Sequence, residues 1–432
     1  MSSYDLNLRD RRKVLLSGPA ELSWIRKDSE VELFSALLSE LGILDRDLLI
    51  RIFYSHEKVN LIIDLLKNHF QFAGLPPLSD LTILEDNVIF FGTKFGDYVS
   101  SQEYVRDVLT NVSLSLNITL ISTREFSAFY QKSFRCIKAD SVGEIERFLH
   151  FAEPVAFVNL TGEELGIKIP RQVRVLDVWG SGFPPYAAHA SIGWPEMRNY
   201  FPLLSNVCYQ PKWTSMFAVG AQGTRVYPEL DQAGLKRDLS ESGEIRIGAF
   251  CRTAKLNLKT VELWAEIMRK VERANLYFAF IQSNSESQAF VRSIFTRLGV
   301  NGGRIRFLRR MSTEQYLSVL GTMDLNLGAF PEQGGISALD SLMMGVPYIV
   351  HEGRSNTYTS TLVLKELEFG NWSALDDVSY VHLAVACADH LEAHSNVCRQ
   401  RIRDSVLGSE LAGASRTGSA WISFIRGNQS IG

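Results

Sequence analysis

Apolar residues recur with a helical period near the start of the chain. In the stretch 30–41 they fall on one face, at Val31, Leu33, Phe34, Leu37, Leu38 and Leu41. This 3.6-residue period predicts an amphipathic helix. A second stretch, 60–70, repeats the pattern before glycine and proline break it at 74–77. We therefore expect residues 1–84 to form an N-terminal helical segment.

From about residue 85, short β-branched runs alternate with polar stretches that are typical of surface helices. The runs lie at 88–92, 118–122, 155–160 and 173–178. Strands that alternate with helices favour a parallel α/β sheet. We expect a Rossmann-like domain over residues 85–240.

The alternation becomes more regular after a polar segment at 225–243, which we interpret as an interdomain linker. The expected strands are 245–250, 276–282, 305–308, 325–328 and 347–350, and the expected helices are 259–271, 286–298, 313–320 and 336–344. This order is typical of a doubly wound sheet. We expect an α/β protein whose two Rossmann-like domains face each other across a cleft. The second domain covers 241–432, and a short helix at 421–425 packs back across the cleft.

Composition narrows the class of protein. The chain has 432 residues, of which 46% are hydrophobic and 22% charged, so a disordered chain, a collagen and a coiled coil are excluded. A net charge of −3 gives no basic field for nucleic acid or an anionic membrane, and we expect neither partner. No apolar run approaches the roughly 20 residues of a membrane span.

Cysteines, histidines and the N-terminus favour a cytoplasmic protein without a metal centre. The five cysteines form no C-x-x-C pair, which indicates reduced, buried thiols. Histidine and cysteine do not cluster as zinc ligands do. The polar N-terminus lacks the apolar core of a signal peptide, so we expect the five N-x-S/T sequons to be chance matches.

Two loops of the second domain carry candidate chemistry, because doubly wound sheets bind ligands at the carboxyl ends of their strands. Lys255, after strand 245–250, offers a compact charge for an anion, although a solvated surface lysine is the simpler interpretation. Gly334 and Gly335 precede a helix whose free amides suit a diphosphate. An ordinary glycine-capped helix remains the alternative there.

Further polar groups lie in the same helix and in a third loop. Ser337 can donate a hydroxyl, and Asp340, on the same helical face, can accept ribose hydroxyls. In the loop 308–312 the backbone can bond a flat base, and Arg309 or Arg310 can stack on it or reach a phosphate. A solvated basic edge is the alternative. Together the loops fit a nucleotide diphosphate, whereas G-x-G-x-x-G and Walker A patterns are absent.

Residues 245–268 and 304–353 resemble the C-terminal lobe of the O-linked N-acetylglucosamine transferase-like family, which includes bacterial cytoplasmic N-glycosyltransferases that modify adhesins. The shared features are F-x-R/Q-x-x-K after a strand, a later F-P, a glycine-rich turn with T/S, a helix with an acidic residue, and G-V-P. The resemblance implies a GT-B fold. It also implies metal-independent, inverting transfer from UDP-GlcNAc or UDP-Glc, with no other cofactor.

The resemblance also implies which residues bind the donor. By position, Lys255 and the helix start match the diphosphate site, and Asp340 matches the ribose carboxylate. Arg252 matches a polar residue three before the lysine, and Arg309 to Ser312 match the uracil-facing loop. The expected donor-binding residues are Arg252, Lys255, Arg309, Met311, Gly334, Gly335, Ile336, Ser337 and Asp340. The chain departs from the family at Ile336 and Ser337, where hydroxyl or amide residues are common.

The first domain offers candidates for a general base. Asp177 ends an expected strand, and His189 lies in the loop-rich stretch that follows. A hydrogen-bonded structural histidine is the main alternative for His189. Trp179, Tyr186 and Trp194 can line an acceptor cleft, although such aromatic residues are more often core. The expected catalytic residues are Lys255, Asp177 and His189.

The function that we expect is transfer of a hexose or N-acetylhexosamine from a UDP-sugar to a Ser/Thr or Asn side chain of a polypeptide. Two alternatives stay open: transfer to a glycan, lipid or small molecule, and an inactive GT-B subunit that partners an active glycosyltransferase. Self-association is a further possibility. The resemblance does not name the acceptor.

Overall fold

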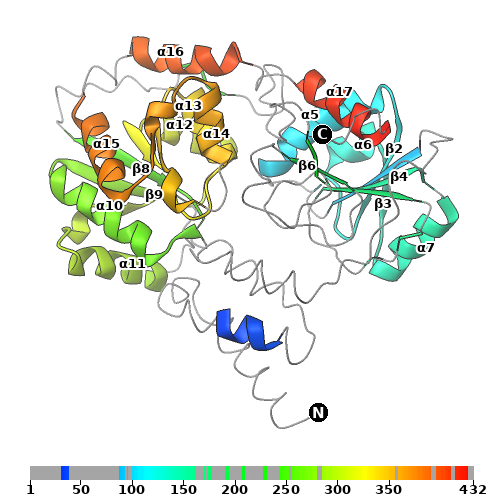
Figure 1. The fold of residues 1–432 in the computed structure, drawn as a ribbon, viewed down its shortest axis with the longest axis horizontal. Coiled ribbons are helices and arrows are strands. Elements are labelled where there is room, and N and C mark those ends of the chain that lie inside the picture. The colour runs from blue at the N-terminus through cyan, green and yellow to red at the C-terminus, as the bar shows by residue number, and fades with distance from the viewer. Residues whose placement is uncertain are drawn as a thin grey trace, which may run out of the picture. The chain divides into compact units, whose positions relative to one another are not determined.

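The computed structural model describes three regions of the chain. They are residues 31–37; residues 87–230 apart from 93–94, 96–99, 153, 161–166, 168, 171–172, 178–189, 194–206 and 210–226; and residues 244–426 apart from 253–254, 280–284, 356–358, 391–395 and 410–413. The chain divides into two compact units (Figure 1). Unit 1 comprises 1–70 and 227–406, and unit 2 comprises 71–226 and 407–432. The chain therefore passes from one unit to the other more than once.

Unit 2 is built on a parallel sheet. Its strands, in spatial order, are β3 (Arg135–Lys138), β2 (Asn117–Ser122), β1 (Asn87–Phe91), β4 (Ala156–Asn159), β5 (Arg174–Asp177), β6 (Ala190–Gly193) and β7 (Val207–Tyr209). The four strands predicted from apolar runs are confirmed as β1, β2, β4 and β5. The prediction missed β3, β6 and β7. In β3 no residue is fully buried, so this edge strand has no apolar run to reveal it.

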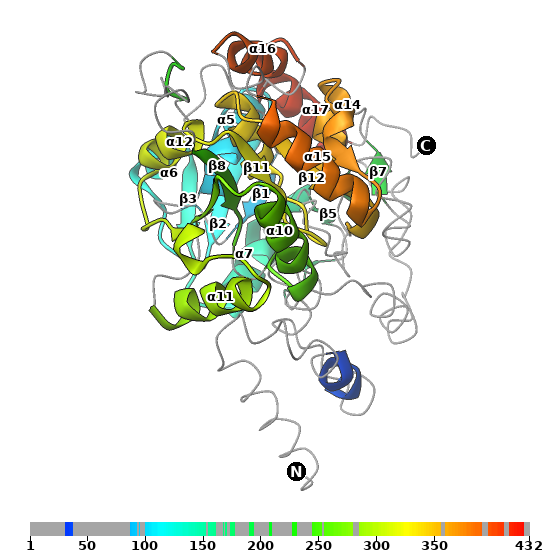
Figure 2. The same cartoon turned by 90° about the vertical axis from the view of Figure 1, so that its left-hand side faces the viewer.

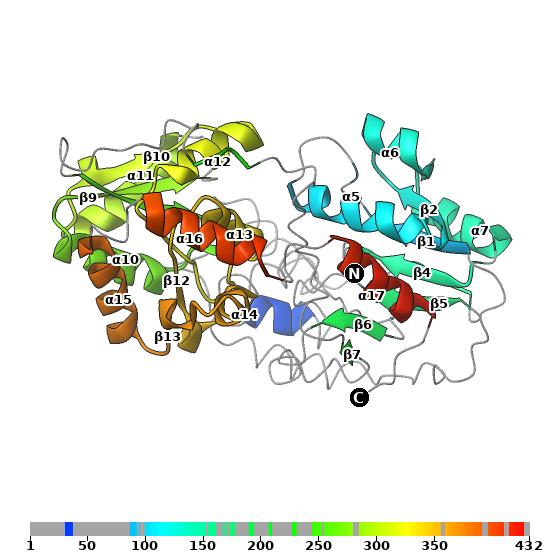
Figure 3. The same ribbon diagram turned by 90° about the horizontal axis from the view of Figure 1, so that it is seen from above.

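Among the described residues, this sheet is accompanied by the helices α5 (Ser100–Ser113), α6 (Ala128–Ser133), α7 (Val142–Ala152) and α17 (Ala414–Arg426). The last is longer than the helix predicted at 421–425. It lies beside α5 (Figure 3), and its buried Trp421 stacks on Phe90 of β1 with ring centroids 6.2 Å apart. Helix α17 therefore contributes to the core of unit 2.

Unit 1 contains a second parallel sheet. Its order is β10 (Ile305–Phe307), β9 (Ala274–Ala279), β8 (Ile245–Phe250), β11 (Leu325–Leu327), β12 (Tyr348–His351) and β13 (Ser373–Ala374). The five strands expected from the sequence are confirmed, with small shifts at their ends. In both sheets the chain builds outward in one direction and then restarts on the other side of the first strand, which is the doubly wound order.

From residue 258 onward, the helices that the structure describes in unit 1 are α10 (Leu258–Lys270), α11 (Ser285–Arg297), α12 (Thr313–Gly321), α13 (Ile336–Met343), α14 (Thr359–Glu366), α15 (Asp377–Asp389) and α16 (Asn396–Leu407). The first four are the predicted helices. Asn257 caps α10 by accepting a hydrogen bond from the Thr260 amide at 2.9 Å, which fixes where that helix begins. Helices α10 and α15 lie side by side (Figure 2).

Three sequence predictions concern the segments that precede the sheet of unit 1. Residues 31–37 are helical, with Leu33, Phe34 and Leu37 buried, which confirms part of the predicted helix. The second predicted helix, 60–70, lies outside the described residues. Within the expected polar linker, Tyr227 and Leu230 are buried, so this described part packs into unit 1 and is not a solvated connection.

Candidate functional site

The candidate site lies at the point in the sheet of unit 1 where the order of the strands reverses, between β8 and β11. Strands β8 and β11 are neighbours, and their carboxyl ends lead into the two loops that the sequence singled out. The loop after β8 carries Lys255, and the loop after β11 ends at the start of α13. Ligands of doubly wound sheets bind in the crevice at such a switch point.

The Lys255 ammonium lies against the turn that leads into α13. Its Nζ donates to the Gln333 carbonyl oxygen at 3.0 Å and is 3.6 Å from Oε1 of Glu332. The side chain is only 17% exposed, which is unlike the solvated surface lysine that position alone would favour. The structure therefore brings together the lysine and the helix start that the sequence predicted as partners.

Hydrogen bonds from α10 hold the neighbouring loop. Asn257 Nδ2 and Thr260 Oγ1 both donate to the carbonyl oxygen of Phe330, at 2.5 and 2.8 Å. Both donors are buried. These bonds join the loop after β11 to the start of the helix that follows β8.

Helix α13 begins without a side-chain cap. Its N-cap is Gly335, and its first turn contains no acidic residue, so nothing on the helix itself competes for an anion at this end. Gly334 is packed so closely that an added Cβ would overlap Ser337 Oγ and lie 2.8 Å from the Tyr348 hydroxyl. A side chain at position 334 would therefore require Ser337 or Tyr348 to shift, and the absence of one allows a ligand to approach the backbone.

Asp340 faces the protein interior in this structure. The residue is 1% exposed, and its Oδ1 accepts a hydrogen bond of 2.8 Å from the Tyr227 hydroxyl. This bond joins α13 to the segment at which the chain enters unit 1. The predicted ribose contact of Asp340 stays a prediction.

The other expected donor residues are less enclosed. Arg252 and Arg309 are exposed, whereas Ile336, Ser337 and Met311 are partly buried. Strand β10, which precedes the expected uracil-facing loop, is separated from β8 by β9. The roles assigned to Arg252, Arg309 and Met311 therefore stay predictions.

The structure does not describe the side chains of the two expected general bases, Asp177 and His189. Asp177 is the last residue of β5, which matches the strand end expected from the sequence, but nothing is described of its side chain. His189 and the aromatic residues Trp179, Tyr186 and Trp194 lie outside the described residues. The acceptor side of the reaction thus rests on sequence alone.

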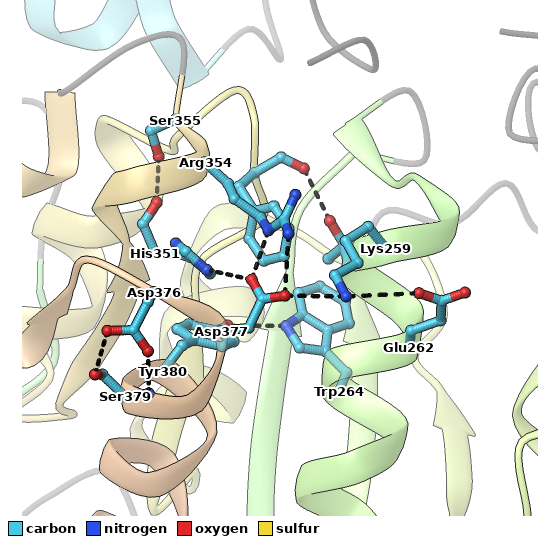
Figure 4. Close-up of polar contacts among 12 residues, drawn as sticks. Lys259, Glu262, Trp264, His351, Arg354, Ser355, Asp376, Asp377, Ser379 and Tyr380 are labelled. Carbon is cyan, nitrogen blue, oxygen red and sulfur yellow. Dashed lines mark hydrogen bonds and ion pairs between the residues drawn. The ribbon is translucent and has the colours of Figure 1, made fainter.

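A second polar cluster, which the sequence analysis did not identify, lies at the start of α15 (Figure 4). Asp377 accepts two hydrogen bonds from Arg354, at 2.5 and 3.0 Å, and lies 3.0 Å from Lys259 Nζ and from His351 Nε2. The Arg354 guanidinium, with Lys259 and His351, holds the pKa of Asp377 well below its usual range. Because its members lie on separate helices, strands and loops, and Lys259 is far from the other three in the sequence, local periodicity gives no sign of the cluster.

His351 belongs to this cluster and ends β12. Its ring packs between Phe330 and Tyr380, with centroids 5.0 and 5.3 Å away. Burial lowers the pKa of His351, so the ring is neutral near pH 7. The residue therefore links the loop before α13 to helix α15 without adding charge.

Within the described residues the protein has neither a candidate metal site nor a candidate membrane span. No group of three or more His, Cys, Asp and Glu side chains there could hold a metal ion. None of the helices in this part of the chain is long and apolar enough to cross a membrane. The cysteines described there, Cys136, Cys251, Cys387 and Cys398, are free thiols.

Comparison with known sequences agrees with the resemblance. No family model matches the chain. It is 29% identical over 174 residues to a probable UDP-N-acetylglucosamine–peptide N-acetylglucosaminyltransferase SPINDLY of Eustoma exaltatum subsp. russellianum, and 27% identical over 172 residues to that of Arabidopsis thaliana. Each match covers 39% of this chain but 19% of the relative, so the chain spans about a fifth of the length of these curated relatives.

Comparison with solved structures confirms the fold. Thermobaculum terrenum O-GlcNAc transferase superposes with a TM-score of 0.74 at 15% identity, over 98% of this chain and 88% of that one. Anabaena HepE in complex with UDP-glucose gives a TM-score of 0.54 at 11% identity, over 78% and 99% of the two chains. The chain has the GT-B fold, and its resemblance to the O-GlcNAc transferase-like glycosyltransferases is confirmed.

Proposed function

We propose that this protein is a glycosyltransferase that moves a hexose or N-acetylhexosamine from a UDP-sugar to a polypeptide side chain, by inverting displacement without a metal ion. The observation that carries the proposal is the position of Lys255. Its ammonium meets the turn before α13 at the switch point of a GT-B sheet, with a 3.0 Å bond to Gln333. The related SPINDLY proteins, named as UDP-N-acetylglucosamine–peptide transferases, support this substrate class.

The chemistry requires stabilisation of the departing diphosphate. When the bond between the anomeric carbon and the β-phosphate oxygen breaks, negative charge grows on that oxygen. A lysine that is 17% exposed and the positive end of α13 supply fixed positive potential in a partly dry site. The acceptor hydroxyl or amide attacks from the opposite face, and Asp177 and His189 are the proposed bases that take its proton.

The proposal is tested by replacing Lys255. We expect Lys255→Ala to lower the rate of transfer by about 100-fold or more, because a preorganised charge at the leaving group is lost. The matched control is Lys270→Ala, since Lys270 is 55% exposed at the end of α10 and pairs only with the nearby Glu266 in its described contacts. Transfer by Lys255→Ala at the rate of the unchanged protein would show that the site is wrongly assigned.

The class of acceptor is tested separately. The protein is incubated with radiolabelled UDP-sugars and cell extract, with GDP- and ADP-sugars for comparison and with EDTA in parallel. Labelled polypeptide bands support the proposal, whereas label only in glycan or lipid fractions supports the first alternative. Transfer that stops in EDTA contradicts the metal-independent mechanism. No binding of any nucleotide sugar by calorimetry favours the inactive-subunit alternative.

A further inference from the structure

The turn before α13 is held by a side chain that the sequence analysis did not identify. Gln333 is 2% exposed. Its Nε2 donates to Ser355 Oγ and to Thr361 Oγ1, both at 2.8 Å, and its Oε1 accepts from the Thr361 amide at 2.9 Å. The two hydrogens and the oxygen of this amide are thus all bonded within the protein.

The groups that bind Gln333 are themselves fixed. Ser355 Oγ donates to the carbonyl oxygen of His351, the last residue of β12, at 2.5 Å. Thr361 is 1% exposed in α14, and the preceding Ser360 donates to the carbonyl oxygen of Gly334. Hydrogen bonds therefore connect the turn 333–334 to the end of β12 and to the first half of α14.

The backbone of the same residue contacts the candidate catalytic lysine. The Gln333 carbonyl oxygen accepts the 3.0 Å hydrogen bond from Lys255 Nζ. A buried amide bonded in three directions cannot rotate without leaving donors and acceptors unpaired, which is costly in a protein interior. The side-chain bonds therefore hold in place the residue whose carbonyl oxygen accepts from the Lys255 ammonium.

We propose that Gln333 is a positioning residue for the donor diphosphate. It fixes the turn so that the Lys255 ammonium and the first amides of α13 are directed at the same anion. This inference rests on the proposed function, because the anion is taken to be the diphosphate of the nucleotide donor. Gln333 itself need not touch the donor, since it acts through Lys255 and through the helix start that follows.

The test separates binding of the diphosphate from binding of the nucleoside. Gln333→Met keeps the length of the side chain but removes its hydrogen bonds. We expect the dissociation constant for UDP, measured by calorimetry, to rise about tenfold, since two or three buried bonds orient the anion site. The dissociation constant for uridine, measured by NMR titration, should change by less than about threefold because uridine has no phosphate.

The matched control is Gln400→Met, the same chemical change at an exposed position of α16. It should leave both constants unchanged. A double-mutant cycle adds a readout that a purely structural role would not move. If Gln333 acts through Lys255, then Gln333→Met in a Lys255→Met background should weaken UDP binding clearly less than it does alone.

Several outcomes overturn the inference: UDP affinity that is unchanged in Gln333→Met, equal losses for UDP and uridine, or fully additive effects in the cycle. If Gln333→Met does not fold, Ser355→Ala removes one bond of the set and should still weaken UDP more than uridine. If the unchanged protein binds no UDP, the proposed function fails, and inorganic pyrophosphate then decides the inference. If the unchanged protein binds pyrophosphate and Gln333→Met does not, the inference is supported. If the unchanged protein does not bind pyrophosphate either, the inference is overturned.

Discussion

At the residue scale, the charges of unit 1 are placed by contacts between distant parts of the chain. Lys255 and Asp377 are each ordinary surface residue types, yet each is enclosed by groups from other loops and helices. Lys255 contacts Gln333 and Glu332, and Asp377 contacts Arg354, Lys259 and His351. The first cluster faces the candidate donor site, and the second joins α15 to the end of β12.

The Asp377 cluster predicts a particular dependence of stability on pH. The pKa of Asp377 is lowered in the folded protein, whereas in the unfolded chain it has the usual value for aspartate, about 4. As the pH falls through that value, the unfolded chain therefore binds a proton at Asp377 before the folded protein does. The stabilisation is therefore complete above about pH 5 and is lost as the pH falls toward about 2. We expect Asp377→Asn to be less stable at pH 7 and to lose less stability on acidification, as measured by urea unfolding at several pH values.

The control for this prediction is Asp389→Asn, at the exposed end of the same helix, where the side chain is 61% exposed and 3.8 Å from Arg273. It should keep the acid dependence of the unchanged protein. An identical loss of stability on acidification in Asp377→Asn and the unchanged protein would contradict the assignment.

At the element scale, helices α10 and α15 are joined by a buried polar contact within an apolar core. Trp264 Nε1 of α10 donates to the Tyr380 hydroxyl of α15 at 2.9 Å, and both residues are fully buried. The same hydroxyl lies 3.4 Å from the carbonyl oxygen of Gly328, next to β11. This bond fixes how the two helices pack behind the loop that carries Lys255.

Tyr380→Phe therefore leaves a buried indole N–H without this acceptor. We expect it to lower the free energy of unfolding by about 1–3 kcal/mol, as measured by urea unfolding. After Trp264→Phe the same change should cost clearly less, because the donor is already absent. Tyr277→Phe serves as the control, since that hydroxyl bonds Glu244 at a partly exposed site and should cost less. Equal costs at the two tyrosines would contradict the prediction.

At the scale of the whole molecule, segments that are neighbours in the sequence do not always belong to the same unit. Helix α17 follows the last helix of unit 1 in sequence but belongs to the core of unit 2. Its Trp421 is buried with Phe90 of β1 and Val108 of α5. Helix α17 thus packs in the same core as the sheet that is formed by residues 87–209.

Replacing Trp421 should affect one unit more than the other. We expect Trp421→Ala to destabilise unit 2 by about 3–5 kcal/mol, because a large buried side chain is lost. In hydrogen exchange with mass spectrometry, peptides that cover β1 should lose protection while those that cover β8 keep it. Phe151→Ala is the matched aromatic control, since Phe151 is 82% exposed and should change stability by less than about 0.5 kcal/mol. An equal loss of protection in β8 would contradict this division.

Much of the fold was predictable because buried strands and amphipathic helices mark the sequence locally. Strand β8 coincides with the predicted run, and α10 to α13 differ from prediction by a residue or so at their ends. Two of the elements that were not predicted, β3 and α16, lack such marks. Strand β3 is an edge strand with no fully buried residue, and α16 contains charged residues such as Arg399 and Arg403 that are buried by contacts with distant backbone carbonyls.

The sequence by itself determined two alternating α/β regions and the loops that hold the proposed donor-binding lysine and the glycine-rich start of a helix. Local periodicity and motif spacing are properties of short segments, so they can be recognised in the sequence without the tertiary structure. Only the tertiary structure decided that Lys255 bonds Gln333, that Gln333 is fixed by Ser355 and Thr361, and that Asp340 bonds Tyr227. These pairs are 22–113 residues apart. Their hydrogen bonds form only when the parallel sheet brings the ends of separate strands together.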